Sequence, residues 1–168
     1  NNLKKLFAYS SISQIGFITL GISLVTTSGL IASVVHIANH AITKGAVFLL
    51  LGCIAMNNKN LSIDKIKGLG KNMPLIAGGI VISGLSLVGI PGTVGFISKW
   101  NLIFAILDKG YWWLAIITLC SSLITIIYIW KLIEIMYFKQ ADETNKPRER
   151  VPLIMVICSL FLVFLCVY

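Results

Sequence analysis

The chain has 168 residues, of which 57% are hydrophobic and only 12% are charged. About a quarter of the residues of a soluble domain are charged, so this composition is typical of an integral membrane protein and excludes an ordinary soluble domain. The net charge of +8 lies mostly in short polar gaps between apolar runs, a pattern that indicates membrane topology and lipid headgroup contact and argues against nucleic-acid binding.

Two apolar runs, 6–25 and 30–56, come first in the chain. Each is long enough for a helix to cross a bilayer, which takes about 20 residues. The chain does not begin with Met, and its first run is longer than the apolar core of a signal peptide. We therefore expect a C-terminal piece of a longer protein or a split subunit, folded as a single transmembrane bundle over residues 1–168.

The stretch 74–107 has 34 residues and one charged side chain, Lys99. A straight helix of this length would measure about 51 Å, far more than a hydrocarbon core of about 30 Å. Its middle contains Pro91, Gly92 and Gly95, which are residues that interrupt helices. The stretch therefore either folds back as a hairpin or crosses the membrane once as a broken helix.

Two further runs, 111–138 and 151–168, complete the set of predicted crossings, and the basic residues choose between the hairpin and the broken helix. A single broken crossing puts ten Lys and Arg residues on one side of the membrane and Lys109 alone on the other. A hairpin would remove most of this bias. The positive-inside rule thus predicts an all-α membrane fold of five crossings, one of them broken, with the basic face toward the cytoplasm or its equivalent. Because unwound backbone is tolerated at membrane depth only inside protein or beside water, the break itself indicates transport.

His36, His40 and Lys44 recur every fourth residue within the second run, so a helix places them on one face. A charged group at the bilayer centre costs at least about 2.5–3.5 kcal/mol, and histidine titrates near neutrality. We interpret the three as a proton relay. One alternative is that they only hydrogen bond within the packing. A zinc site is a weaker alternative, because these helices offer no third Cys, Asp or Glu ligand.

Lys99 follows the predicted break by a few residues, where water and free carbonyls can reach it, and we expect it to carry protons as well. The alternative is a lysine that extends to the membrane interface beside Trp100. The segment 9–16 is polar for a membrane helix; close helix packing is the default interpretation and a wet path is the alternative. No Asp or Glu lies deep in the predicted crossings, so an acidic partner for Lys44 is expected from other sequence or another subunit. The four cysteines form no CxxC pair, and we expect neither a metal nor a cofactor.

Four segments resemble the proton-translocating antiporter-like subunits of respiratory complex I and of the multisubunit Mrp cation/proton antiporters. Residues 4–16, KKLFAYSSISQIG, resemble the family's KRxLAYSSxSQxG segment, and 36–49, HIANHAITKGAVFL, are similar to its HxxxHxxxK helix. Residues 68–74, GLGKNMP, look like the loop that enters the broken helix. Residues 84–100, GLSLVGIPGTVGFISKW, look like that helix. Within the family, these motifs are most similar to the D-type component of the Mrp antiporters.

The resemblance covers most of the chain and implies the C-terminal third of a fold of about fourteen crossings. It implies that Lys44 is the central proton-carrying lysine, that His36 and His40 link it toward the neighbouring half-channel, and that Lys99 serves an exit. Lys4 matches a lysine of the family's polar axis. The family's glutamate–lysine pair belongs to the preceding half and cannot be placed in this chain.

The sequence thus predicts a transporter component that forms and breaks no substrate bonds. Its expected function is proton translocation in a sodium/proton antiporter complex of the bacterial inner membrane, with other membrane subunits as partners. The first alternative is a proton-pumping subunit of an NADH:quinone oxidoreductase or a related hydrogenase, in which redox energy comes from other chains. The second alternative is a purely structural subunit whose lysines only anchor helices.

Overall fold

The computed structural model describes residues 3–57, 62–139 and 152–167, and these residues are helical apart from turns and one isolated bridge. The long helices are α1 (Leu3–Ser23), α2 (Thr27–Asn57), α4 (Pro74–Val88), α5 (Val94–Asp108), α6 (Trp112–Tyr137) and α7 (Leu153–Leu165). Each predicted run contains a helix, and the stretch 74–107 contains two. Between α2 and α4, where the sequence predicted only a loop, lie the short elements η1 (Ile63–Ile66) and α3 (Leu69–Asn72).

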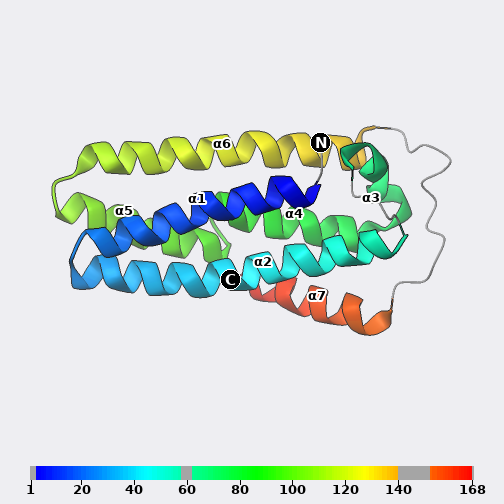
Figure 1. Cartoon of the computed structure of the whole chain (residues 1–168), viewed down its shortest axis with the longest axis horizontal. Helices are drawn as coiled ribbons and strands as arrows, with labels where there is room; N and C mark the ends of the chain where they lie inside the picture. Colours follow the sequence, from blue (N-terminus) through cyan, green and yellow to red (C-terminus); the bar gives the residue numbers. More distant parts are fainter. Residues whose placement is uncertain (1–2, 58–61, 140–151, 168) are drawn as a thin grey trace.

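The helices α4 and α5 follow one another along the bundle in the same direction (Figure 1). The first begins at the end that holds α3, and the second ends where the chain turns into α6. The stretch therefore traverses the bundle once and does not fold back as a hairpin. Within the described residues, α1, α2 and α6 are long and apolar enough to span a membrane, and α4 and α7 are shorter apolar helices. The count of five crossings stays a prediction.

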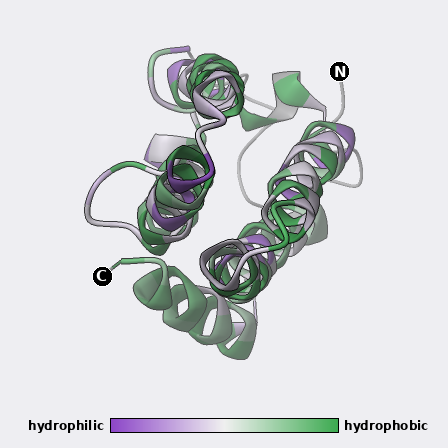
Figure 2. Cartoon of the chain, turned by 90° about the vertical axis from the view of Figure 1, so that its left-hand side faces the viewer, coloured by the Kyte–Doolittle hydropathy of each residue, from purple (hydrophilic) through white to green (hydrophobic). Residues whose placement is uncertain are grey.

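The bundle carries apolar side chains outward and polar side chains inward. Large hydrophobic residues are exposed along the helices, as at Ile12, Val34 and Ile127, and hydrophobic colour dominates the view along the bundle in Figure 2. The buried polar and charged residues are Ser10, Gln14, Ser33, His36, Thr43, Lys44, Ser83, Ser86, Thr93, Ser98, Lys99, Thr118, Thr125 and Ser159. This distribution suits a bilayer, where an apolar surface meets lipid and polar groups must find partners within the protein.

Helix α2 is the centre of the packing and contacts α1, α4, α5 and α7. One apolar cluster, around Phe7 and Leu50, lies toward the α3 end of the bundle, and a second, around Phe17 and Ile106, lies toward the opposite end. The polar residues of α2 between these clusters are enclosed by protein on several sides. The polar face of α2 therefore lies in the interior of the bundle.

The break between α4 and α5 depends on glycine, with left-handed backbone at Gly89 and Gly92 and close packing at Gly95. Gly89 ends α4 with φ 86° and ψ 49°, a left-handed conformation that residues with a side chain rarely adopt. Gly95 lies in the first turn of α5, where an added Cβ would overlap the backbone carbonyl of Ser86. Pro91 and Gly92 lie exposed in the connection itself. The predicted break is thus present at residues 89–93, and Gly95 lets α5 pack closely on the end of α4.

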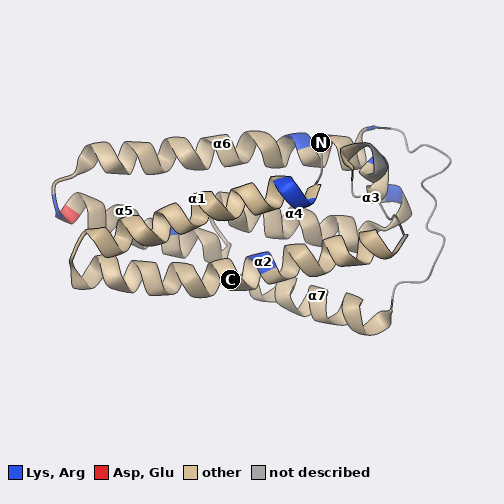
Figure 3. Cartoon of the chain, in the orientation of Figure 1, with Lys and Arg blue, Asp and Glu red and all other residues tan. Residues whose placement is uncertain are grey.

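Many charged residues lie toward the two ends of the bundle (Figure 3). Lys4 and Lys5 lie in the first turn of α1, on the side of the bundle toward α3, and Asp108 and Lys109 lie where α5 ends, on the opposite side. Of the predicted basic loop 139–150, only Lys139 is within the described residues. Two lysines interrupt the uncharged interior, one in α2 and one in α5.

Candidate functional site

The histidines and the lysine of α2 share one face of the helix, as their spacing predicts. The rings of His36 and His40 are nearly parallel, with an angle of 8° between their planes and 6.4 Å between their centroids. His36 is buried, and Lys44, one turn beyond His40, is 6% exposed. The column is therefore continuous along α2 and closed off from the outer surface of the bundle at both of its ends.

His36 joins α2 to α1 and α5. Its Nδ1 lies 2.9 Å from Ser98 Oγ, and its Nε2 lies 3.1 Å from Gln14 Oε1. Because the Gln14 oxygen accepts, the His36 Nε2 donates, and in the neutral ring Nδ1 accepts the Ser98 hydroxyl proton. When both nitrogens carry protons, the Ser98 hydroxyl can donate instead to the carbonyl of Gly95, 3.2 Å away. This site can hold the imidazole in either protonation state.

Lys44 reaches from α2 into α1. Its Nζ donates to the carbonyl of Phe7 at 2.6 Å and to the hydroxyl of Ser10. The rings of Phe7 and Phe48 lie 5.6 and 6.0 Å from the amine, within the range of a cation–π contact. Both hydrogen-bond partners are uncharged, and a hydroxyl can accept from an ammonium or donate to a neutral amine. The surroundings of Lys44 therefore accommodate the amine with or without its extra proton.

Lys99 caps the end of α4. The last four carbonyls of a helix have no partner in the helix itself. In α4, those of Leu85 and Ser86 accept from the backbone after the helix, and those of Leu87 and Val88 accept from Lys99 Nζ at 2.8 Å each. The sequence left open whether Lys99 extends to an interface, but its side chain is 5% exposed and directed inward. The amine thus completes the hydrogen bonding of the broken helix.

Two more contacts surround the Lys99 amine. Ser122 Oγ of α6 lies 3.2 Å from Nζ, and the ring of Phe17 in α1 lies 5.1 Å away. The same Phe17 ring meets His36 edge-on, with 5.8 Å between centroids. Since the Phe17 ring contacts both side chains, the lysine of α5 and the column of α2 belong to one connected group of side chains.

The other predicted site residues lie outside this group. Lys4 is exposed in the first turn of α1 at the end of the bundle, and Pro91 and Gly92 form the exposed turn of the break. Gly95, in the first turn of α5, packs against the Ser86 carbonyl of α4 beside this group. Among the described residues, no three His, Cys, Asp or Glu side chains gather in a way that could hold a metal ion.

The sequence interpretation missed the partners of the charged residues. Ser98 and Ser122 were not singled out, and Ser10 and Gln14 were noted only within a polar segment. A signal was available for α1, because its buried residues recur at alternating steps of three and four: Leu3, Phe7, Ser10, Gln14, Phe17 and Gly21. Polar residues on the buried stripe of a membrane helix need partners, and the polar column of α2 was the obvious candidate.

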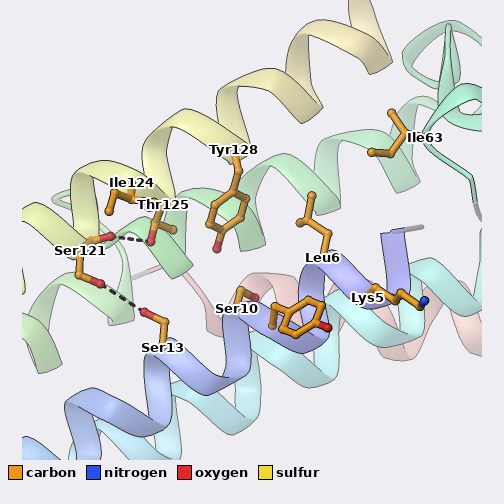
Figure 4. A pocket seen from close by; sticks show the side chains of 10 residues that line it. Lys5, Leu6, Ser10, Ser13, Ile63, Ser121, Ile124, Thr125 and Tyr128 are labelled. Atoms are coloured by element: carbon orange, nitrogen blue, oxygen red, sulfur yellow. Dashed lines mark hydrogen bonds between the residues drawn. The ribbon is translucent and has the colours of Figure 1, made fainter. Parts of the chain in front are cut away.

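Two pockets whose walls combine hydroxyl groups with apolar side chains lie between α1 and α6. One, of about 500 Å³, contains Ser10 and Ser13 on one wall and Thr125 and Tyr128 on the other, with Lys5 at its edge (Figure 4). Another, of about 550 Å³, continues beyond the contact between Ser13 and Ser121, whose hydroxyls are 3.3 Å apart. Because Ser10 is also a partner of Lys44, the first pocket reaches the column of α2. The wet-path interpretation of the polar segment therefore gains a concrete location.

A small cavity of about 10 Å³ lies between α1, α2, α4 and α5. It is lined by Gln14, His36, Asn39, His40, Thr43, Ser86, Leu87, Gly95 and Ser98. This volume is about the smallest that can hold one water molecule. Gln14 Nε2 and His40 Nδ1 are buried here without a hydrogen-bond partner in the protein. A water held in this cavity would connect the two histidines with the hydroxyls of α4 and α5.

The sequence of the chain matches a known family model and known membrane proteins. A family model described as NADH:quinone oxidoreductase/Mrp antiporter, TM, matches residues 1–125. The chain is 34% identical over 149 residues to an NADH-quinone oxidoreductase subunit N from Desulforudis audaxviator, a match that covers 89% of this chain and 30% of the relative.

Solved structures give the same picture. A chain of the membrane-bound sulfane sulfur reductase, an archaeal respiratory membrane complex, has a TM-score of 0.88 and 36% identity and is matched over 99% of this chain and 33% of its own length. A chain of the Mrp complex from Dietzia sp. has a TM-score of 0.85 and 25% identity, covering 95% of this chain and 38% of that one. The chain thus spans about a third of the length of these relatives.

Proposed function

We propose that this chain, which belongs to the NADH:quinone oxidoreductase/Mrp antiporter family of transmembrane proteins, carries protons through the membrane as part of a longer subunit. The observation that carries the proposal is the connection between the two buried lysines. Lys44 stands in one column with two histidines, and the first of these, His36, contacts Ser98, the neighbour of Lys99 in the broken helix. Besides Lys44, this group contains three more titratable side chains, those of His36, His40 and Lys99. Helix packing alone does not require so many.

The proton route follows the contacts. Water in the pocket between α1 and α6 supplies a proton to Lys44 by way of the Ser10 hydroxyl. His40 is the next group on α2, and a water in the small cavity carries the proton on to His36. From His36 Nδ1 the proton passes to the Ser98 oxygen, and the hydroxyl proton that Ser98 releases is taken up by water, which carries it to the neutral amine of Lys99. Electrostatic repulsion between the two lysines opposes their simultaneous charging and favours stepwise transfer.

The experiment that tests this role replaces Lys44 by arginine in the full-length protein within its membrane complex. Arginine keeps the charge but does not release its proton at physiological pH. We expect Lys44→Arg to lower proton translocation in sealed vesicles by at least about tenfold, with a normal amount of assembled complex. Lys131→Arg, on the exposed face of α6, is the matched control and leaves translocation unchanged. Unchanged translocation in Lys44→Arg would favour the purely structural role instead.

The histidines have their own test. We expect His36→Ala and His40→Ala to slow translocation while the complex still assembles, because each removes a member of the column between the lysines. Full translocation in both variants would remove the relay role assigned to them. The role of Lys4, which lies exposed at the start of α1, is expected to be smaller, and Lys4→Ala tests it in the same assay.

We also propose that the chain crosses the membrane five times as one bundle over residues 1–168. The helices α4 and α5 together make one broken crossing, in the C-terminal third of a fold of about fourteen crossings. The end of the bundle with Lys4 and Lys5 faces the cytoplasm, and the membrane is the bacterial inner membrane. The remaining two-thirds of the protein and further membrane subunits are its partners. Labelling of single cysteines placed at Lys5 and Lys109 from each side of the membrane tests this orientation.

Two energy sources fit the proposal. The motifs GLSLVGIPGTVGFISKW and NHAITKG resemble the D-type component of the Mrp antiporters, which favours exchange of protons for sodium ions. The identities of 34% and 36% to chains of respiratory complexes favour a redox-driven pump. Imposing a sodium gradient on vesicles without a respiratory substrate separates the two. Proton movement under these conditions supports the antiporter, and proton movement only during electron transfer supports the pump.

A further inference from the structure

The broken helix is held from two sides at a single residue, Val94. The backbone N–H of Val94 donates to the carbonyl of Cys166 at 3.2 Å. The backbone carbonyl of Val94 accepts from Asn39 Nδ2 at 2.7 Å. Beside these bonds, Thr93 and Val167 form an isolated antiparallel bridge. We call these five residues the clasp.

The clasp answers a physical requirement of the break. The first N–H groups of a helix have no partner within the helix, and no water is available to them at membrane depth. Helix α7 ends beside the break, near the middle of the bundle (Figure 1), where the carbonyl of its C-cap residue, Cys166, has no partner within the helix. The bond from Val94 to Cys166 satisfies one group of each kind. It also joins the positive end of one helix dipole to the negative end of another.

The clasp also ties α7 to the column of α2. The Cys166 side chain is fully buried, and its Sγ lies 3.7 Å from Thr43 Oγ1, on the residue just before Lys44. Thr43 Oγ1 lies in turn 3.3 Å from Ser86 Oγ of α4. The end of α7 therefore touches α2, α4 and α5 at the level of the proposed proton route.

We propose that Asn39 and the Cys166–Val167 end of α7 are positioning elements that fix the register of α5 on α2. Two contacts set this register: Asn39 holds the carbonyl of Val94, and His36, one turn earlier on α2, meets Ser98, one turn later on α5. A shift at the first contact displaces the second and moves Lys99 with it. The effect of this register on proton transfer rests on the proposed function.

The decisive variant is Val94→Pro in the full-length protein within its complex. Val94 is the first residue of α5, a position where proline suits the helix, and Thr93 before it is already extended. Proline removes the N–H, and its ring occupies the place of the hydrogen, so the bond to Cys166 is lost. Val94→Ala is the matched control, since it trims the side chain and keeps the N–H.

Two readouts separate positioning from general stability. We expect Val94→Pro to slow proton translocation by about fivefold, the change that loss of one ordinary hydrogen bond produces in an equilibrium. We also expect faster amide hydrogen exchange in the first turns of α5, measured by mass spectrometry, with exchange in α6 unchanged. Val94→Ala should match the wild type in both. Translocation and exchange equal to those of Val94→Ala would overturn the proposal, as would faster exchange with unchanged translocation.

Asn39→Leu tests the clasp from the other side if Val94→Pro does not assemble. It removes the amide donor at similar volume, and we expect the same two changes. Wild-type exchange in α5 would overturn the proposal. Lys44→Arg, assayed alongside, reports on the proposed function alone: if it translocates normally, that function fails, whereas the exchange measurement still decides whether the clasp holds α5.

Discussion

Lys44 and Lys99 are both buried in the bundle, yet their amines have different kinds of partner. The amine of Lys44 binds Ser10 and the carbonyl of Phe7, which lies inside the continuous helix α1. The amine of Lys99 binds the carbonyls of Leu87 and Val88, which the break leaves without helical partners. Helix α1 is complete without Lys44, whereas α4 needs Lys99 to finish its hydrogen bonding. Lys99 is therefore part of the hydrogen bonding that completes the fold, whereas Lys44 is not.

The packing beside the two lysines also differs. Beside Lys99, the first turn of α5 packs on backbone, because Gly95 lies against the carbonyl of Ser86. Beside Lys44, the neighbouring Gly45 faces the end of a leucine side chain, Leu162, at 3.2 Å from the position of an added Cβ. Backbone cannot move aside at low cost, and the tip of a leucine can. The Lys99 region is thus the rigid one.

The largest effect is expected from Gly95→Ala, compared with Gly45→Ala. The methyl group at residue 95 would overlap the Ser86 carbonyl and force α4 and α5 apart, which we expect to destabilise the protein by more than about 3 kcal/mol. The methyl group at residue 45 displaces only a leucine tip and improves the helix propensity of α2, so the change there should stay within about 1 kcal/mol. Thermal unfolding of the purified complex measures both. Equal losses in the two variants would show that the two regions do not differ in rigidity.

A smaller difference is expected between Lys99→Met and Lys44→Met, which remove the amines at similar length. The first leaves the carbonyls of Leu87 and Val88 buried without partners, at about 1–3 kcal/mol for each. The second leaves Ser10 with the Phe7 carbonyl, 2.9 Å away, so little stability is lost. Both variants should lose proton translocation, but only Lys99→Met should unfold at a clearly lower temperature. A lower unfolding temperature for Lys44→Met than for Lys99→Met would contradict the distinction between the two lysines.

The sequence predicted the features that depend on spacing and on backbone chemistry. The column of α2 followed from the interval of four residues, and the break followed from Pro91 and the glycines around it. The broken single traverse followed from the basic residues, although the count of crossings stays a prediction. These inferences needed no knowledge of how the helices pack, because they rest on the spacing within one helix, on its ends or on the charges between helices.

The partners of the lysines could not be predicted in the same way. A contact such as Lys99 with Ser122 joins residues of different helices, and its existence depends on how those helices are rotated and packed. The bond from Val94 to Cys166 joins two helix ends far apart in the chain and uses only backbone atoms, which leave no mark in the sequence. Composition could not reveal η1 and α3 either, since a polar loop and a short helical turn use similar residues.

The smallest effects are expected from removing a single hydroxyl beside each lysine amine, that of Ser10 or that of Ser122. Ser10→Ala removes one of the two partners of Lys44 and the hydroxyl that connects it to the pocket between α1 and α6, so we expect translocation to fall by about fivefold. Ser122→Ala removes the weakest contact of Lys99, at 3.2 Å, and leaves both carbonyls at 2.8 Å, so the rate should change by less than about twofold. Initial rates of proton uptake into sealed vesicles distinguish the two. If Ser122→Ala were the slower variant, the route would enter through α6 toward Lys99, and the hydroxyl of Ser10 would be only a packing partner of Lys44.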